Sequence, residues 1–151
     1  MIEKGEMEPN LNGKAVEVIL SNRVGYERIA MACSASFARI YGLAPERIED
    51  LKTIVSEAAM NAMQHGNRGK PKARVTVSMK FMDDTITVWI KDEGDGIKQL
   101  PVRPDIGRII DNLDPPVGLG LFLIENLADN VEFNEATDGG HSLKMAIKIR
   151  N

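Results

Sequence analysis

Residues that build disulfide frameworks and metal centres are scarce in this sequence, which has one cysteine and two histidines among its 151 residues. A single cysteine excludes an internal disulfide and is typical of a reducing cytoplasm, so we expect a cytoplasmic protein. Cys33 lies in the small, apolar run MACSA, which predicts a buried and inert thiol. A metal site made wholly of protein ligands is not expected, because no His/Cys cluster has ligand spacing.

Long apolar runs and an excess of positive charge are missing as well. No stretch approaches the ~20 apolar residues of a membrane span, and the N-terminal MIEKGEMEPNLNGK has no signal-peptide core. The net charge of −3 argues against direct binding to nucleic acid or a membrane surface, either of which needs a basic face. We expect a loose polar tail over residues 1–13 and a single domain over 14–151.

Hydrophobic periodicity predicts an α+β fold. Apolar residues alternate with polar ones in RVTVSMKF, DTITVWIK and SLKMAIKI, which is typical of half-buried antiparallel strands. The link from Met82 to Asp84 suits a hairpin between the first two. We therefore expect a two-layer sandwich, with helices on one face of a mixed, mainly antiparallel sheet. The expected strands are 15–20, 74–81, 84–91, one beginning at 131–133, and 142–149; the expected helices are 25–41, about 45–65, and 117–129.

The helix over 45–65 carries an unusual polar pair. Its core stripe is predicted to contain Ile48, Leu51, Val55, Ala58, Ala59 and Ala62. Glu57 and Asn61 lie one turn apart on another face, although Asn is a poor helix former. Taken alone, the pair favours an ordinary solvated face; the alternative is a carboxylate and an amide directed at a ligand.

Two glycine motifs follow further along the chain. DEGDG, residues 92–96, comes directly after a strand and allows a tight turn or a close approach of the backbone to a ligand. VGLGL, residues 117–121, leads into a helix, whose free N–H groups and dipole suit phosphate. Each motif is weak alone: a plain Asp/Gly turn is the commoner explanation of the first, and glycine used only for close packing is an alternative for the second.

The segment between these motifs, residues 97–117, has no clear periodicity. It contains Pro101, Pro104, Pro115 and Pro116, and long irregular connections are often binding loops or lids. Arg103 and Arg108 lie within it and are weak candidates for phosphate contacts, because a solvated loop charge is the commoner role.

The order of these motifs resembles the ATP-binding fold of gyrase, heat-shock chaperones, histidine kinases and MutL (the GHKL superfamily, or Bergerat fold). The fuller strings EAAMNAMQHG and PVGLGLFLIENLAD are similar to anti-sigma factor serine-protein kinases of bacterial partner-switching systems. The resemblance covers roughly residues 45–150. The stretch from Asp114 to Val117 departs from the superfamily pattern, because it lacks a Ser or Thr ahead of the glycines.

The resemblance implies roles for individual residues. Glu57 would be the general base, and Asn61 would be the ligand of a Mg²⁺ ion that bridges the ATP phosphates. Asp92 would accept a hydrogen bond from the adenine amino group. Glycines 94 and 96 would give clearance, and the GLGL segment (Gly118, Leu119, Gly120, Leu121) would bind the phosphates.

It also implies a function. We expect an anti-sigma factor with Mg·ATP-dependent serine/threonine protein kinase activity toward a STAS-type anti-sigma-factor antagonist, with a sigma factor as second partner. Two alternatives stay open: a nucleotide-gated binding module without phosphotransfer, and a stand-alone ATPase of the same fold. Relatives form homodimers, and Trp89, alone among the polar residues on one side of its strand, is a candidate for a dimer or partner surface.

Overall fold

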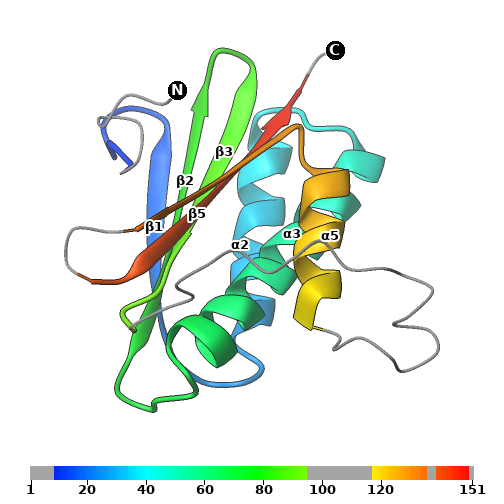
Figure 1. The fold of residues 1–151 in the computed structure, drawn as a ribbon. Coiled ribbons are helices and arrows are strands. Elements are labelled where there is room, and N and C mark those ends of the chain that lie inside the picture. Colours follow the sequence, from blue (N-terminus) through cyan, green and yellow to red (C-terminus); the bar gives the residue numbers. More distant parts are fainter. Residues whose placement is uncertain (1–8, 95–116, 136–138, 150–151) are drawn as a thin grey trace.

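The fold is built on one sheet, seen on the left of Figure 1 in a computed structural model that describes residues 9–94, 117–135 and 139–149. Its strand order is β1-β2-β3-β5-β4, and every neighbouring pair within the described residues is antiparallel. The expected α+β class is therefore confirmed. The strands are β1 (Ala15–Ser21), β2 (Arg74–Met82), β3 (Thr85–Lys91), β4 (Asn130–Glu135) and β5 (His141–Lys148).

The hairpin between β2 and β3 is the tight turn that the sequence predicted. Asp83 and Asp84 both have positive φ, 55° and 54°. Two consecutive residues of this kind form the turn whose twist matches that of paired strands, and Asp tolerates the conformation better than most residues. The turn sets the register between Val77 and Ile90 and between Met79 and Val88. The apolar sides of the two strands consequently face the same layer.

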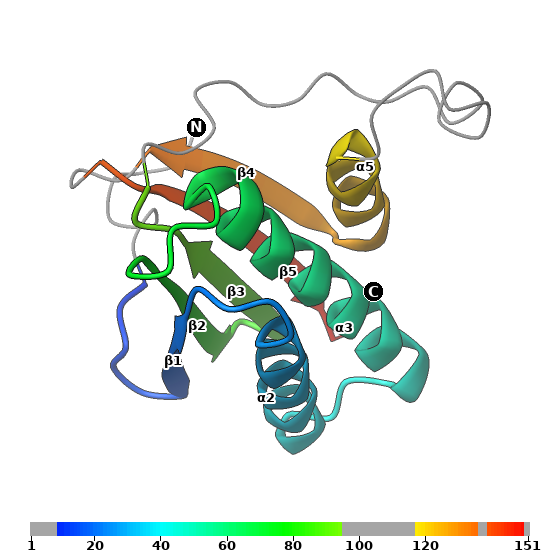
Figure 2. The same cartoon turned by 90° about the horizontal axis from the view of Figure 1, so that it is seen from below.

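Helices form the second layer and cover one face of the sheet (Figures 1 and 2). They are α2 (Glu27–Ile40), α3 (Pro45–Asn61), the π-helix η1 (Ala62–Gly66) and α5 (Val117–Leu127). Pro45 opens α3, where its missing N–H costs nothing. The predicted helix over 45–65 thus consists of two parts, α3 and the wider turn η1.

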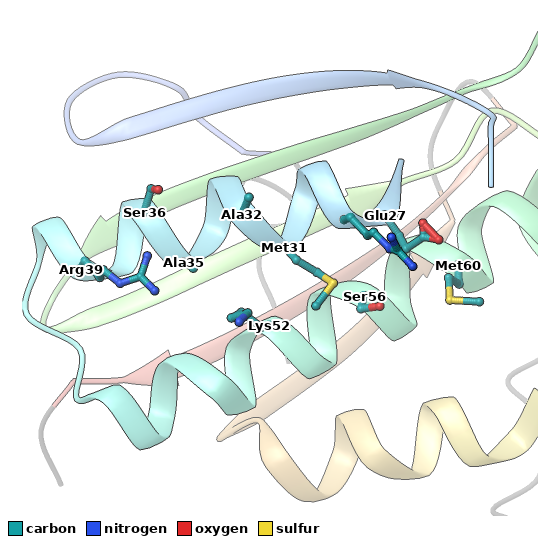
Figure 3. A pocket seen from close by; sticks show the side chains of 10 residues that line it. Glu27, Met31, Ala32, Ala35, Ser36, Arg39, Lys52, Ser56 and Met60 are labelled. Carbon is teal, nitrogen blue, oxygen red and sulfur yellow. The ribbon is translucent and has the colours of Figure 1, made fainter. Parts of the chain in front are cut away.

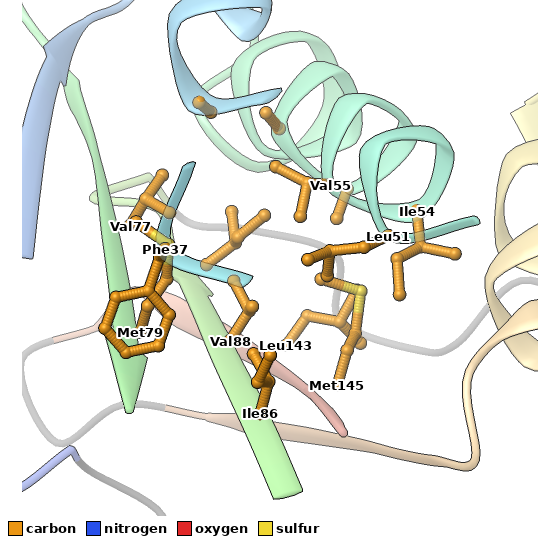
Figure 4. Close-up of a cluster of buried hydrophobic side chains, with 14 of the residues drawn as sticks. Phe37, Leu51, Ile54, Val55, Val77, Met79, Ile86, Val88, Leu143 and Met145 are labelled. Carbon is orange, nitrogen blue, oxygen red and sulfur yellow. The ribbon is translucent and has the colours of Figure 1, made fainter. Parts of the chain in front are cut away.

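The hydrophobic core lies between the sheet and α3 (Figure 4). The stripe predicted for this helix is buried in full, including Ala62 at the start of η1. It meets the inward side chains of the central strands, and together these groups fix the distance between the layers. The most deeply buried large side chains include Leu51, Ile54, Met79, Val88, Met145 and Ile147.

Two side chains differ from the sequence-based expectation. Cys33 is only partly buried, because the buried side of α2 runs through Ala30, Ser34 and Phe37, and Cys33 lies at its margin. Trp89 is 7% exposed, so it is not an exposed surface aromatic. Trp89 lies on the face of the sheet away from the core. There the Lys144 ammonium is 5.7 Å from the centroid of its ring.

Within the described residues, none of the helices is both long and apolar enough to cross a membrane. Most of the predicted lid, residues 97–116 of 97–117, falls outside them, together with Gly96, Arg103 and Arg108. The proposed division into a tail (1–13) and one domain (14–151) stays a prediction.

Candidate functional site

Glu57 and Asn61 lie at the C-terminal end of α3, both half-buried. Their neighbours Ala58 and Ala59 face the core, which directs the Glu–Asn pair toward α5 instead. A side-chain carbon added at Gly120 would lie 2.8 Å from Glu57 Oε2, and 3.4 Å and 3.7 Å from the amide nitrogen and oxygen of Asn61. Glycine at position 120 therefore lets the start of α5 approach this pair closely.

The GLGL segment forms the first turns of α5, as the sequence predicted. Gly118 lies in the first turn. The side chain of Leu121 is buried and lines a hollow with Phe133 and Leu143. Leu119 is partly buried. The backbone N–H groups of a first helical turn have no partners within the helix, and here they lie next to a carboxylate and an amide.

Asp92 follows β3 directly and is 5% exposed. Its carboxylate Oδ1 accepts hydrogen bonds from the backbone N–H of His141, at 3.1 Å, and of Gly94, at 3.2 Å. Its own backbone N–H donates to the carbonyl of His141 at 2.9 Å. Burial raises the pKa of the Asp92 carboxyl, and the hydrogen bonds and the charge of His141 counteract part of that rise.

Three glycines surround Asp92 and leave no room for a side chain. A carbon added at Gly66 would overlap the Asp92 carboxylate, and one added at Gly140 would overlap the Asp92 carbonyl. A carbon added at Gly94 would overlap the Gly66 carbonyl. Only backbone can approach the carboxylate from these sides. Gly66 and Gly140 were not among the site residues predicted from the sequence. In the sequence, Gly66 indicated only where a helix ends.

The π-helix η1 joins the two parts of the site. It begins directly after Asn61 and ends at Gly66, the glycine that faces Asp92. Its wider turn is closed by the backbone N–H of Asn67, which donates to the Ala62 carbonyl at 2.7 Å. Single π turns inside helices are frequent at functional sites. Asn61, which the sequence suggests for magnesium, and Asp92, which it suggests for adenine, are therefore both next to η1.

Asn67 fixes the loop that carries Asp92 and was missed by the sequence prediction. It is fully buried; its Oδ1 accepts the backbone N–H of Glu93 at 2.8 Å, and its Nδ2 donates to the Arg74 carbonyl at 3.0 Å. The Glu93 carboxylate in turn accepts the Arg74 backbone N–H at 2.7 Å. The residues after β3 are thereby tied to the start of β2. The only sequence signal was an Asn directly after the helix-ending Gly66.

The chemistry of the donor set fits a magnesium nucleotide. Among the described residues, no three His, Cys, Asp or Glu side chains gather as a metal cluster. Mg²⁺ commonly takes few protein ligands and keeps water and substrate phosphates. Asn61 would supply one neutral oxygen, next to the start of α5.

Comparison with known proteins identifies the family. Residues 20–147 match the model of the histidine kinase-like ATPase domain. The chain is 33% identical to the anti-sigma F factor of Oceanobacillus iheyensis, over 82% of this chain and 84% of that protein. It is 34% identical to the serine-protein kinase RsbW of Listeria innocua, over 72% of this chain and 70% of that protein. The chain belongs to this family of anti-sigma factor serine-protein kinases.

Solved structures agree in fold. The chain resembles a Mycobacterium tuberculosis structure of RsbU and RsbW domains, with a TM-score of 0.64 and 17% identity over 89% of this chain. It spans 32% of that longer chain. It also resembles a chain of the SiaB-SiaC complex of Pseudomonas aeruginosa, with a TM-score of 0.61 and 16% identity, over 87% of this chain and 88% of that one. The ATPase-like fold and the family expected from the sequence are confirmed.

Proposed function

We propose that this chain is a cytoplasmic anti-sigma factor that transfers the γ-phosphoryl group of Mg·ATP to a serine or threonine of a STAS-type antagonist. The observation that carries the proposal is the approach of Gly120 to Glu57 and Asn61, which brings a carboxylate and an amide to the first turns of α5. A general base is useful only where phosphate and an acceptor hydroxyl can meet.

Each residue would have a separate task. The Glu57 carboxylate would take the proton of the acceptor hydroxyl while the new O–P bond forms and the bond to the β-phosphate oxygen breaks, releasing ADP. Asn61 Oδ1 would hold Mg²⁺, which, when bound, neutralises charge on the phosphates. Asp92 would accept from the adenine amino group. The backbone N–H groups in the first turn of α5, at Gly118 and Leu119, would donate to the phosphates, and Gly120 would lie under them. Gly94 and Gly96 would give clearance for the base.

A groove between α2 and α3 supports the proposal of a protein substrate (Figure 3). It encloses about 660 Å³, with the strands behind the two helices in this view. Met31 and Met60 give it flexible apolar walls, which suit protein docking. Arg28, Arg39 and Lys52 add positive charge. They outnumber the one acidic residue of the lining, Glu27, so the groove complements an acidic surface. The groove reaches Ser56, the neighbour of Glu57 in sequence, so we assign it to the antagonist that carries the acceptor hydroxyl.

We also propose a homodimer, supported by β1. This strand pairs only with β2 among the described strands, and Val16 and Ile19 on it are 42% and 54% exposed. A free edge with apolar side chains is a common site of association between copies. The particle mass in solution, measured by light scattering, tests this point; a monomer at all concentrations would contradict it.

The phosphotransfer proposal is tested by incubating the chain with labelled ATP and candidate antagonists. Glu57→Gln keeps the size of the side chain but removes its basicity, so transfer should fall about 10²- to 10⁴-fold while ATP affinity stays within about twofold. Glu49→Gln is the matched control, because Glu49 is exposed on the same helix and its carboxylate pairs with the neighbouring Lys52.

The outcomes separate the alternatives. Unchanged transfer in Glu57→Gln would remove Glu57 from the mechanism. Nucleotide binding without any transfer by the wild-type chain would favour the nucleotide-gated binding module. Phosphate release without labelling of a protein would favour the stand-alone ATPase.

A further inference from the structure

His141 has a buried side-chain nitrogen for which the described structure offers no hydrogen-bond partner. The residue is 5% exposed, and its Nδ1 makes no hydrogen bond. The nearest charged oxygen, Asp92 Oδ1, lies 3.8 Å away, which is beyond hydrogen-bond range. Unsatisfied buried polar atoms are rare and cost free energy, so each one calls for an explanation. Here the unsatisfied atom stands next to the carboxylate expected to read adenine.

The sheet register directs both side chains toward the helix layer. Ile90 pairs with Leu143, and both belong to the buried core. Asp92 lies two residues after Ile90, and His141 lies two residues before Leu143, so they share that face because side chains alternate along a strand. The backbone bonds between Asp92 and His141 hold the two groups side by side.

The imidazole of this pair packs against an aromatic ring. The ring of His141 packs on Phe133, with centroids 5.5 Å apart. Glycines 66, 94 and 140 provide no side chains near the Asp92 end of the pair. The pair therefore offers one carboxylate acceptor and, with the proton on Nδ1, one neighbouring N–H donor.

We propose that His141 is a second base-reading residue, whose Nδ1–H donates to N1 of adenine, directly or through one water, while Asp92 accepts from the 6-amino group. This inference rests on the proposed ATP site. Adenine presents an amino donor next to a ring-nitrogen acceptor on its Watson–Crick edge, which complements the pair. Guanine presents a carbonyl oxygen next to an N–H, so both contacts would become repulsive.

The test compares nucleotides that differ by one atom or group. ATP, 1-deaza-ATP (which lacks N1) and GTP are titrated into the wild-type chain, His141→Phe and His141→Gln. The wild type should bind ATP about three- to tenfold more tightly than 1-deaza-ATP, the range of one hydrogen bond. His141→Phe keeps a ring against Phe133 but has no donor, so it should bind ATP and 1-deaza-ATP equally and discriminate less against GTP. His141→Gln, with an N–H donor, should recover part of the ratio.

An unchanged ratio of ATP to 1-deaza-ATP affinity in His141→Phe would overturn the inference and leave His141 as a packing residue. If that variant does not fold, the wild type still decides, through ¹⁵N NMR of its histidine rings. The chain has two histidines, and His65→Gln assigns the signals. The Nδ1 signal of His141 should move on addition of ATP and stay in place with 1-deaza-ATP; equal movement with both would overturn the inference.

The comparison of ATP with 1-deaza-ATP can fail separately from the kinase proposal. A chain that phosphorylates its partner but binds ATP and 1-deaza-ATP equally would contradict only the role of His141. A chain that binds no ATP would contradict the proposed function itself.

Discussion

At the scale of single residues, Asp92 illustrates a conflict between stability and ligand recognition. Its carboxylate is buried, and the lost hydration raises its pKa above the usual 3.8. The folded state therefore binds the proton more tightly than the unfolded state. It follows that the ionised carboxylate destabilises the fold, and that this penalty appears as the pH rises above the ordinary pKa. Functional sites often hold such unfavourable groups.

Asp92→Asn should consequently stabilise the ligand-free protein at pH 7, by about 1 kcal/mol, while it weakens ATP binding at least tenfold. The amide oxygen of Asn can still accept the N–H groups of Gly94 and His141. Thermal unfolding of both proteins between pH 4 and pH 8 checks this. The stability difference should shrink toward pH 4, where the wild-type carboxyl takes up its proton; a difference independent of pH would contradict the role assigned to burial.

The sequence predicted some residues of this site and missed others for a physical reason. Glu57, Asn61, Asp92 and Gly120 belong to local motifs whose spacing implies chemistry, and the structure brings Gly120 to the Glu57–Asn61 pair. The other contributors act through contacts between distant parts of the chain. His141 meets Asp92 across 49 residues, and no local pattern encodes that contact. The missed residues are Gly66, Asn67, Gly140 and His141.

At the scale of elements, η1 determines how the site is arranged. A continuous α-helix and an α-helix that ends in a π turn have the same apolar periodicity here, so the sequence predicted one helix over 45–65. The π turn widens the last turn and brings Gly66 against Asp92. The position of this turn is fixed from outside the helix, because the buried Asn67 is bonded to Arg74, at the start of β2, and to Glu93, after β3.

Gly66→Ala tests this arrangement. The added methyl group would overlap the Asp92 carboxylate, so we expect a loss of about 1–3 kcal/mol in the free energy of unfolding and at least tenfold weaker ATP binding. Urea denaturation and nucleotide titration measure the two effects. Gly69→Ala is the control. A side chain at Gly69 would meet nothing within 4 Å, but the backbone φ of +67° is strained for any residue other than glycine. This control should lower stability alone, and an equal loss of ATP affinity in both variants would contradict the packing argument.

At the scale of the whole molecule, the two layers give the chain two different surfaces. The residues that we propose for the nucleotide lie on α3, at the start of α5 and directly after β3. The groove lies between α2 and α3, on the helical layer (Figures 2 and 3). The fold class and layer arrangement were predictable, since strand alternation and helix periodicity extend along most of the chain. The burial of Trp89 was not predictable from the sequence, because it depends on contacts with residues of other strands, such as Lys144.

A charge reversal in the groove should separate partner binding from nucleotide binding. Arg39→Glu should weaken binding of the antagonist about tenfold, most strongly at low salt, and leave ATP affinity unchanged. Lys148→Glu makes the same change in net charge on an exposed residue of β5, outside the groove, and serves as the control. Calorimetric titration at two salt concentrations measures the effect; equal losses in both variants would indicate a general charge effect instead of docking in the groove.

The bond between Asp92 and His141 also has a consequence for synthesis of the protein. The carboxylate can accept from the Gly94 backbone early, but it acquires its His141 partner only when β5 has been made and has paired with β3, long after the residues of α3 have left the ribosome. A nascent chain that ends before His141 holds the residues that we propose for phosphate, but it lacks the strand that flanks the residue that we propose for the base. On that proposal, the adenine side of the site is completed only with β5, the strand that joins β4 to the rest of the sheet.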